Sequence, residues 1–303
     1  MKYITFKNSS GEIKAGWTNH DMVVDMNEAS DGLLPNDLLT LINHYEKFKD
    51  IVALHDASDS EKGRYPFEEV TLLAPLPKPV SVRDFYAFED HVKTARAKRG
   101  LDVIPEWYEI PVFYFTNHLA IKGPGDLIEK PSACEWLDYE LEIACIIGKE
   151  GRNVKAQDAD EYIFGYCIMN DWSARDLQAK EMKVGLGPAK GKDFATSLGP
   201  VIVTPDELES FKTNKGYNLE MTASVNGSLL SKGNFEQIHY TFAQMIERAS
   251  ADVTLHPGEV IGSGTVGTGC ILELGTDVHR WLKPGDEVEL SITGLGTLKN
   301  TIR

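Results

Sequence analysis

Residues 138–151, DYELEIACIIGKEG, constrain the fold because they combine a buried strand with two neighbouring carboxylates. The apolar run predicts a core strand at residues 139–147. Glu140 and Glu142 are two residues apart, so their side chains leave the same face of that strand. Two like charges so close repel each other and raise the pKa of at least one group, unless a cation lies between them. A strand end with two solvated glutamates is the alternative interpretation.

Strand-like segments account for most of the chain beyond residue 73. These runs, which turn-forming residues separate, are PVFYFTN, ELEIACIIG, YIFGYCIMN, PVIVT, LEMTASVNGSLLSKG, VTLHPGEVIGSG, CILELG and DEVELSI. The Asn-Gly pair at residues 226–227 predicts a tight hairpin. Helical spacing predicts two main helices, at residues 89–100 and 241–253, and a short turn at residues 171–178.

Residues 1–72 have a different pattern, in which short strands precede a helix. Two strand-like pieces and a third, DMVVDM, are followed by an amphipathic run at residues 36–54. That run predicts one helix, with Asn36 or Asp37 as its N-cap. We therefore predict an α+β fold that is mostly β, with a small α+β domain at residues 1–72 and a larger domain at residues 73–303.

The charge and composition of the chain argue against several classes of function. A formal charge of −15 disfavours nucleic-acid binding, which needs a basic surface. No apolar run reaches the roughly 18–20 residues of a membrane helix, and the first residues show no apolar block of a signal peptide. Four cysteines without a CxxC pair indicate reduced core residues rather than disulfides or a zinc site. We expect a cytoplasmic protein that binds neither nucleic acid nor membranes.

Two more carboxylates stand at the ends of predicted strands. Asp84 ends a strand-like piece, and Asp171 follows the apolar strand of residues 162–169. With Glu140 and Glu142 they would offer oxygen ligands of the kind that suits Mg²⁺, Mn²⁺ or Ca²⁺ better than zinc. A divalent cation there would relieve the repulsion between the two glutamates. In the alternative interpretation, Asp171 only caps the turn that follows it.

Other ionisable residues carry weaker signals. Arg175 and Gln178 are three residues apart, so on a helical turn they would share a face. Glu273 is a lone carboxylate in an apolar strand-like segment and therefore needs a partner. His91 stands near the start of a charged helix, and on its own it is typical of a surface histidine.

A glycine-rich segment at residues 187–200, GPAKGKDFATSLGP, carries Lys190 and Lys192. Its glycines predict a loop with close backbone contacts. The residue order differs from the GxxxxGK[ST] pattern of a phosphate-binding loop, so we set that interpretation aside.

Five motifs of the chain, in their order, resemble the fumarylacetoacetate hydrolase family. They are DFYAFEDH, DYELE, MNDWSARDLQ, GKDFATSLGP and GSGTVGTGCILEL, and the resemblance covers about residues 73–303. It implies a β-sandwich roll as the catalytic domain, a homodimer and one divalent metal ion in each active site, with Mg²⁺, Mn²⁺ or Ca²⁺ as the expected ion. The metal ligands that it implies are Asp84, Glu140, Glu142 and Asp171.

The same resemblance implies roles for residues around the metal. His91 matches the general base of the fumarylacetoacetase branch, and Glu273 matches the carboxylate that orients this base. The positions that stabilise an oxyanion are matched by Arg175, Gln178 and Lys192. The substrate-contact positions are matched by Tyr114 and Thr265.

The chain departs from that branch at two substrate positions. Met182 stands where the branch has a substrate-binding tyrosine, four residues after the glutamine. The arginine expected after the histidine is displaced, and Arg96 and Arg99 are the nearest candidates. The segment before the catalytic domain is also shorter. These departures concern the substrate and leave the metal ligands unchanged.

We therefore expect a metal-dependent hydrolase that cleaves a carbon–carbon bond in a 1,3-diketone acid, such as an acylpyruvate or a fumarylacetoacetate-like compound. Its partner would be a small 2-oxo or 2,4-dioxo acid, and the helix at residues 90–100 would act as a lid. An oxaloacetate decarboxylase or a 2-oxo acid isomerase or tautomerase on the same metal site is the alternative, because neither reaction needs an attacking water. A non-catalytic binding module is a third interpretation.

Overall fold

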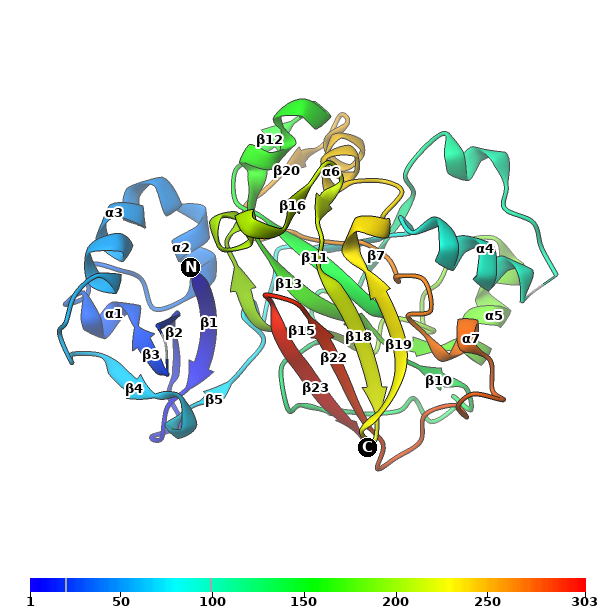
Figure 1. The fold of residues 1–303 in the computed structure, drawn as a ribbon, viewed down its shortest axis with the longest axis horizontal. Coiled ribbons are helices and arrows are strands. Elements are labelled where there is room, and N and C mark those ends of the chain that lie inside the picture. Colours follow the sequence, from blue (N-terminus) through cyan, green and yellow to red (C-terminus); the bar gives the residue numbers. More distant parts are fainter. Residues whose placement is uncertain (20, 99) are drawn as a thin grey trace.

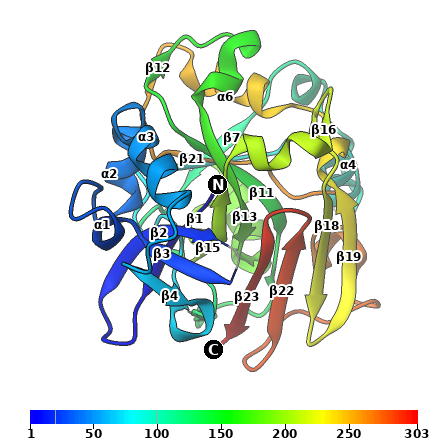
Figure 2. The ribbon, with the colours of Figure 1, turned by 60° about the vertical axis from the view of Figure 1, so that its left-hand side comes forward.

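The computed structural model describes residues 1–19, 21–98 and 100–303. Within these residues, a 12-stranded sheet runs through the molecule, and a five-stranded sheet covers part of one of its faces (Figures 1 and 2). The large sheet has the strand order β4-β3-β2-β1-β15-β13-β11-β21-β6-β7, with β5 paired to β1 and β8 paired to β15. The five-stranded sheet has the order β19-β18-β22-β23-β9.

The strands of the two sheets are short. Those of the large sheet are β1 (Lys2–Lys7), β2 (Ile13–Asn19), β3 (Met22–Asp25), β4 (Arg64–Pro66), β5 (Thr71–Leu72), β6 (Val82–Phe85), β7 (Phe113–Thr116), β8 (Ile121–Lys122), β11 (Leu141–Ile147), β13 (Ile163–Asp171), β15 (Thr196–Val203) and β21 (Val260–Gly262). Those of the five-stranded sheet are β9 (Leu127–Ile128), β18 (Glu220–Val225), β19 (Ser228–Asn234), β22 (Glu287–Ile292) and β23 (Gly296–Ile302).

Small ribbons and helices complete the described part of the chain. The ribbons are β10 (Leu137–Asp138) with β14 (Ser173–Ala174), β12 (Gly151–Arg152) with β20 (Thr254–Leu255), and β16 (Lys212–Thr213) with β17 (Gly216–Tyr217). The α-helices are α1 (Met26–Ala29), α2 (Leu38–Asn43), α3 (Tyr45–Asp56), α4 (Glu89–Ala97), α5 (Arg175–Val184), α6 (Phe242–Ser250) and α7 (Ile271–Leu274). The 3₁₀ helices are η1 (Phe67–Glu69), η2 (Pro105–Tyr108), η3 (Ala156–Tyr162), η4 (Pro205–Phe211) and η5 (Phe235–Gln237).

Strand β11 is covered on both faces. Ile143 and Cys145 belong to the apolar core that the two sheets share, whereas Ala144 and Ile146 belong to a second core formed with the N-terminal strands and helices. A strand buried on both sides has a continuous apolar sequence, which explains why this segment shows no alternation. Because side chains alternate along a strand, Glu142 lies on the same face as Ala144 and Ile146.

The N-terminal elements are joined to the large sheet and lie at its end, opposite α4, α5 and α7 (Figure 1). Strand β1 pairs antiparallel with β15, with Tyr3 opposite Ile202. One continuous sheet therefore crosses residue 72, and the domain boundary that we place there stays a prediction. The N-cap at Asp37 is confirmed, since its carboxylate accepts a hydrogen bond from the Thr40 amide at 2.8 Å. The single helix predicted at residues 36–54 is wrong, because the chain breaks at His44 into α2 and α3.

Two further local predictions were wrong. The strand predicted at residues 270–275 is the helix α7, which forms because the Asp138 carboxylate accepts hydrogen bonds from the first helical amides, those of Ile271 and Leu272. The short turn predicted at residues 171–178 extends into the ten-residue helix α5. The Asp138 carboxylate also binds the Arg175 guanidinium at the start of α5.

The fold class is confirmed as mixed α and β with extensive sheet. The predicted hairpin is also confirmed: Asn226 and Gly227 both have positive φ, of 51° and 77°, and connect β18 to β19. Such a turn follows the natural twist of the two strands. No helix in the described residues is long and apolar enough to cross a membrane.

A buried ion pair ties β6 to the segment before β21. The Arg83 guanidinium contacts the Glu259 carboxylate, and both side chains are more than nine-tenths buried. Ser81 and the His256 amide also donate hydrogen bonds to this carboxylate, at 2.7 and 2.9 Å. The Arg83 guanidinium stacks over the ring of Phe115, 4.7 Å from the ring centre.

We predict that Arg83→Met lowers the free energy of unfolding by about 3–5 kcal/mol, because the Glu259 charge stays buried without its partner. Urea unfolding followed by circular dichroism measures this change. The double variant Arg83→Met with Glu259→Leu is the control, and it should recover most of the loss because no unpaired charge remains. Equal losses in the single and double variants would contradict the prediction.

Candidate metal and catalytic site

Four carboxylates from separate parts of the large sheet meet at one place. Asp84 comes from β6, Glu142 from β11 and Asp171 from the end of β13, and Glu140 lies just before β11. One oxygen of each lies within 4.8 Å of the others, and each residue is at most 5 % exposed. The sequence-based prediction that these residues meet agrees with the geometry, although the predicted strand starts at residue 141 and not at 139.

The electrostatics of this cluster are unfavourable without a cation. Burial, followed by the charges of Asp84, Glu140 and Asp171, raises the pKa of Glu142 well above its ordinary value. Burial and the charge of Asp171 likewise raise the pKa of Asp84. One oxygen of Glu142 and one of Asp171 are buried without a hydrogen-bond partner among the described residues. Buried carboxylate oxygens without partners are costly, so the cluster fits a bound cation.

The donor set and the space around it fit a hard divalent metal ion. All four groups offer oxygen, the ligand that Mg²⁺, Mn²⁺ and Ca²⁺ prefer. Gly262 of β21 leaves this space open, because a Cβ atom at that position would lie 2.6 Å from Oδ1 of Asp84. The Gly264 amide donates a hydrogen bond to the same Asp84 oxygen at 3.2 Å, which orients the carboxylate.

Two buried cations line one side of the cluster. The Lys192 ammonium lies 2.5 Å from Glu140 Oε2 and 2.7 Å from Asp171 Oδ2. The Arg175 guanidinium lies 2.8 Å from the other Glu140 oxygen and 2.9 Å from Oδ2 of Asp138. Burial alone would raise the pKa of Glu140, but Lys192 and Arg175 outweigh it and lower that pKa. Glu140 is therefore held as a carboxylate.

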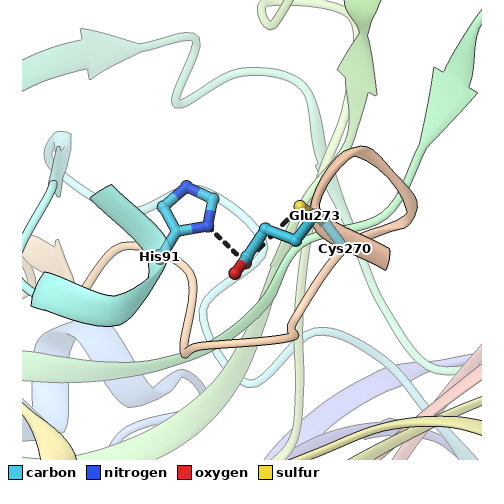
Figure 3. A group of neighbouring side chains, drawn as sticks. All are labelled: His91, Cys270 and Glu273. Atoms are coloured by element: carbon cyan, nitrogen blue, oxygen red, sulfur yellow. Dashed lines mark hydrogen bonds and ion pairs between the residues drawn. The ribbon is translucent and has the colours of Figure 1, made fainter. Parts of the chain in front are cut away.

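A histidine–carboxylate pair lies beside the cluster on the helices α4 and α7 (Figure 3). Nδ1 of His91 is 2.5 Å from Oε1 of Glu273, and both side chains are buried. The second Glu273 oxygen accepts a hydrogen bond from the Thr268 amide at 3.0 Å. His91 is near enough to Glu140 that a positive charge on its ring would help to lower the Glu140 pKa. His91 is thus a buried, paired residue and not the surface histidine of the alternative interpretation.

Of the remaining predicted residues, three contact the cluster or its cations and one does not. Tyr114 on β7 donates a hydrogen bond from its hydroxyl to Asp171, and the Thr265 hydroxyl donates to Glu142 at 3.3 Å. Gln178 accepts a hydrogen bond from Arg175 at 3.2 Å. Met182 lies one turn further along α5, is 43 % exposed and takes no part in the cluster.

The two candidate arginines give no support for a substrate contact. Arg96 on α4 is half-buried, and its side chain donates a hydrogen bond to the Asp102 carbonyl. Arg99 lies outside the described residues.

Sequence reasoning missed three groups that lie next to the predicted residues. Asp138 binds Arg175 and the first amides of α7, Thr268 donates its amide to Glu273, and Cys270 places its thiol 3.7 Å from Glu273 Oε1. The nearness of Asp138 to Glu140 could have been predicted from their spacing, because residues two apart on a strand share a face. The contact of Cys270 with Glu273 follows from the helix α7, which the sequence pattern did not predict.

A sequence model described as "Fumarylacetoacetate (FAA) hydrolase C-terminal" matches residues 81–303. The chain belongs to the fumarylacetoacetate hydrolase family. The five motifs that carry the resemblance, and the acidic cluster that they build, lie within or at the start of this match.

Relatives in this family are similar to the chain over most of its length. The oxaloacetate tautomerase YisK of Bacillus subtilis is 28 % identical over 93 % of this chain and 93 % of its own length. The mitochondrial oxaloacetate tautomerase FAHD2B of Bos taurus is 32 % identical over 92 % of this chain and 83 % of its own. The solved structure of a fumarylacetoacetate hydrolase from Exiguobacterium antarcticum is 29 % identical, has a TM-score of 0.78 and covers 100 % of this chain and 99 % of its own.

We predict that Mg²⁺ stabilises the protein against unfolding and that Glu142→Gln removes most of this effect. At a Mg²⁺ concentration about 100 times the Kd, binding should add about 2.7 kcal/mol to the free energy of unfolding. Replacing this carboxylate with a neutral amide would remove both a charged ligand and one of the repelling charges. Without Mg²⁺, the variant should therefore be at least as stable as the wild type.

Thermal and urea unfolding with and without Mg²⁺ measure both effects. Glu161→Gln is a matched control, because Glu161 is an exposed residue of η3 outside the cluster and should keep the full Mg²⁺ response. A Glu142→Gln variant that responds to Mg²⁺ as the wild type does would show that the ion binds elsewhere.

Proposed function

We propose that the chain is a metal-dependent hydrolase that cleaves the carbon–carbon bond of a 1,3-diketone acid, such as an acylpyruvate or a fumarylacetoacetate-like compound. The observation that carries this proposal is the buried pair of His91 and Glu273 beside the carboxylate cluster. A histidine whose Nδ1–H is held by a carboxylate has Nε2 free to accept a proton from water. Hydrolysis needs such a base to deprotonate the attacking water.

A divalent cation, proposed to be Mg²⁺, would be held by Asp84, Glu140, Glu142 and Asp171. The cluster has four carboxylates and two adjacent cations, one of which, Arg175, also pairs with Asp138, so at least two negative charges remain when all groups are ionised, and a divalent ion would offset them. When bound, the metal would supply positive charge that polarises the oxygens of the diketone acid.

The chain's own residues then account for the steps of hydrolysis. Glu273 fixes the tautomer of His91, and Nε2 of His91 takes a proton from water. The hydroxide attacks the adjacent ketone carbon, and the carbonyl electrons move to its oxygen. Lys192 and Arg175 offer positive charge to this oxyanion, and Gln178 holds the Arg175 guanidinium in place. As the oxyanion collapses, the carbon–carbon bond breaks toward the enolate, which is protonated from the imidazolium.

Tyr114 and Thr265 are proposed to contact the substrate, because each points a hydroxyl at a carboxylate of the cluster. Helix α4 carries His91 at the edge of the site and is proposed to act as a lid. We also propose that the protein is a cytoplasmic homodimer. The family resemblance supports the dimer, and the four free, buried cysteines suit a reducing compartment.

Oxaloacetate tautomerisation or decarboxylation is the second candidate function. It is favoured by the names of two relatives that match the chain over more than nine-tenths of its length, both of which are oxaloacetate tautomerases. Moving a proton between carbon and oxygen of a 2-oxo acid would use the same cation site and the same histidine. The two candidate reactions differ in that only hydrolysis uses an attacking water.

We predict that His91→Ala lowers kcat for 2,4-dioxo acids by about 10²–10⁴-fold, because the variant loses its general base. Metal binding should be unchanged, since His91 is not among the four carboxylates, and the Mg²⁺ response in thermal unfolding is the control. The assay follows loss of the enol absorbance of a series of 2,4-dioxo acids together with pyruvate release, with Mg²⁺ or Mn²⁺ present.

The same series, extended to oxaloacetate, separates the two candidate functions. We expect release of pyruvate and an acid from at least one dioxo acid. A wild-type protein that converts oxaloacetate and leaves every dioxo acid intact would refute the hydrolase proposal and favour the second candidate.

A further inference from the structure

A second group of possible metal ligands lies next to the four-carboxylate cluster. A ring nitrogen of His91, Sγ of Cys270 and a carboxylate oxygen of Glu273 lie within 4.8 Å of one another, and all three residues are at most 7 % exposed. They come from α4, the N-cap of α7 and α7 itself. His91 and Glu273 take part in the proposed hydrolysis, whereas Cys270 has no role in it.

The three ligand atoms converge on one point. Oε1 of Glu273 faces both partners, with Nδ1 of His91 at 2.5 Å and Sγ of Cys270 at 3.7 Å (Figure 3). The other Glu273 oxygen is held by the Thr268 amide, so Oε1 is the oxygen left for this group. In Figure 3, Nε2 of His91 points away from Glu273 and Cys270.

The chemistry of this group differs from that of the neighbouring cluster. Four carboxylates suit a hard ion such as Mg²⁺, whereas a nitrogen, a thiolate sulfur and an oxygen are ligands that Zn²⁺ prefers. Three protein ligands are also the number that holds zinc where a fourth position stays open. In a tetrahedral zinc site, with bonds of about 2.0–2.3 Å, ligand atoms lie roughly 3.3–3.6 Å apart. The sulfur–oxygen distance of 3.7 Å is already close to this, and the contact between His91 and Glu273 must open.

We propose that His91, Cys270 and Glu273 form a Zn²⁺ site that switches the enzyme off, separate from the four-carboxylate site. The inhibitory part of this inference rests on the proposed function, in which His91 is the base. A zinc ion bound to Nδ1 of His91 would replace the proton that Nδ1 shares with Glu273.

The proton balance explains why such binding would inhibit. Zn²⁺ binding releases the thiol proton of Cys270 to solvent, because the thiolate is the metal ligand. The neutral imidazole keeps one proton, which must now sit on Nε2, since Nδ1 donates its electron pair to the metal. Nε2 can then no longer accept a proton from water. Zinc therefore inverts the tautomer that hydrolysis needs, without displacing the ion held by the four carboxylates.

The test compares the wild type with Cys270→Ser and Cys270→Ala. Activity on a 2,4-dioxo acid is measured at saturating Mg²⁺ while Zn²⁺ is titrated, and then at several higher Mg²⁺ concentrations. We expect Zn²⁺ to inhibit the wild type at a concentration that Mg²⁺ does not change. Both variants should keep their basal activity and need at least about 100-fold more Zn²⁺, because losing a ligand should cost no less than the roughly 10–100-fold effect of losing an outer-shell partner.

Co²⁺ absorption gives a readout that needs no substrate. Co²⁺ added to the Mg²⁺-loaded wild type should give a near-ultraviolet thiolate-to-metal band, which should be absent from Cys270→Ser and still present in Glu142→Gln. The last variant is the matched control, because it alters the carboxylate cluster alone. If no substrate is found, this spectrum still tests the site, so failure of the proposed function and failure of the zinc site remain distinguishable.

Three outcomes would overturn the inference. Equal Zn²⁺ sensitivity of the wild type and both Cys270 variants would leave Cys270 as a hydrogen-bond donor to Glu273 only. Relief of inhibition by added Mg²⁺ would place Zn²⁺ at the carboxylates. Absence of the Co²⁺–thiolate band in the wild type would show that Cys270 is not a ligand.

Discussion

The repulsion among buried carboxylates is the interaction on which the rest of the catalytic region depends. Strands β6, β11 and β13 bring three of these groups together, and the apolar side chains around them exclude the water that would otherwise solvate their charge. Lys192 and Arg175 compensate one side of the cluster. The other side keeps carboxylate oxygens without partners among the described residues, which is costly unless a cation binds there. The fold thus holds an arrangement that a bound cation would stabilise.

The site combines two kinds of structural support. The carboxylates stand on paired strands or directly beside them, where neighbouring hydrogen bonds fix each backbone position. His91, the proposed base, and Glu273 stand on α4 and α7, helices outside the sheet that these two side chains connect. The proposed ion site is therefore built on the sheet and the proposed base on a helix outside it. This division would suit the proposed hydrolysis, in which substrate must enter before water is activated.

The sequence predicted the carboxylate cluster well because strand periodicity and strand ends determine where such side chains point. It predicted α7 poorly, since ILEL is equally compatible with a strand and a helix, and the choice is made by Asp138, which lies 133 residues away from Ile271. The contact of Cys270 with Glu273 depends on that helix and was missed for the same reason. The break at His44 between α2 and α3 was also not predicted, because the apolar spacing continues across it. Long-range contacts that override local pattern account for these differences.

The pairing of β1 with β15 has a consequence for how far the N-terminal residues can be separated from the rest of the chain. β15 pairs with β13 on one side, and on the other side its two ends pair with β8 and β1. A shortened chain without β1 would expose free amide and carbonyl groups along part of β15. Exposed strand edges recruit other strands and promote aggregation. The N-terminal residues therefore protect the sheet that carries Asp171 from association with other chains.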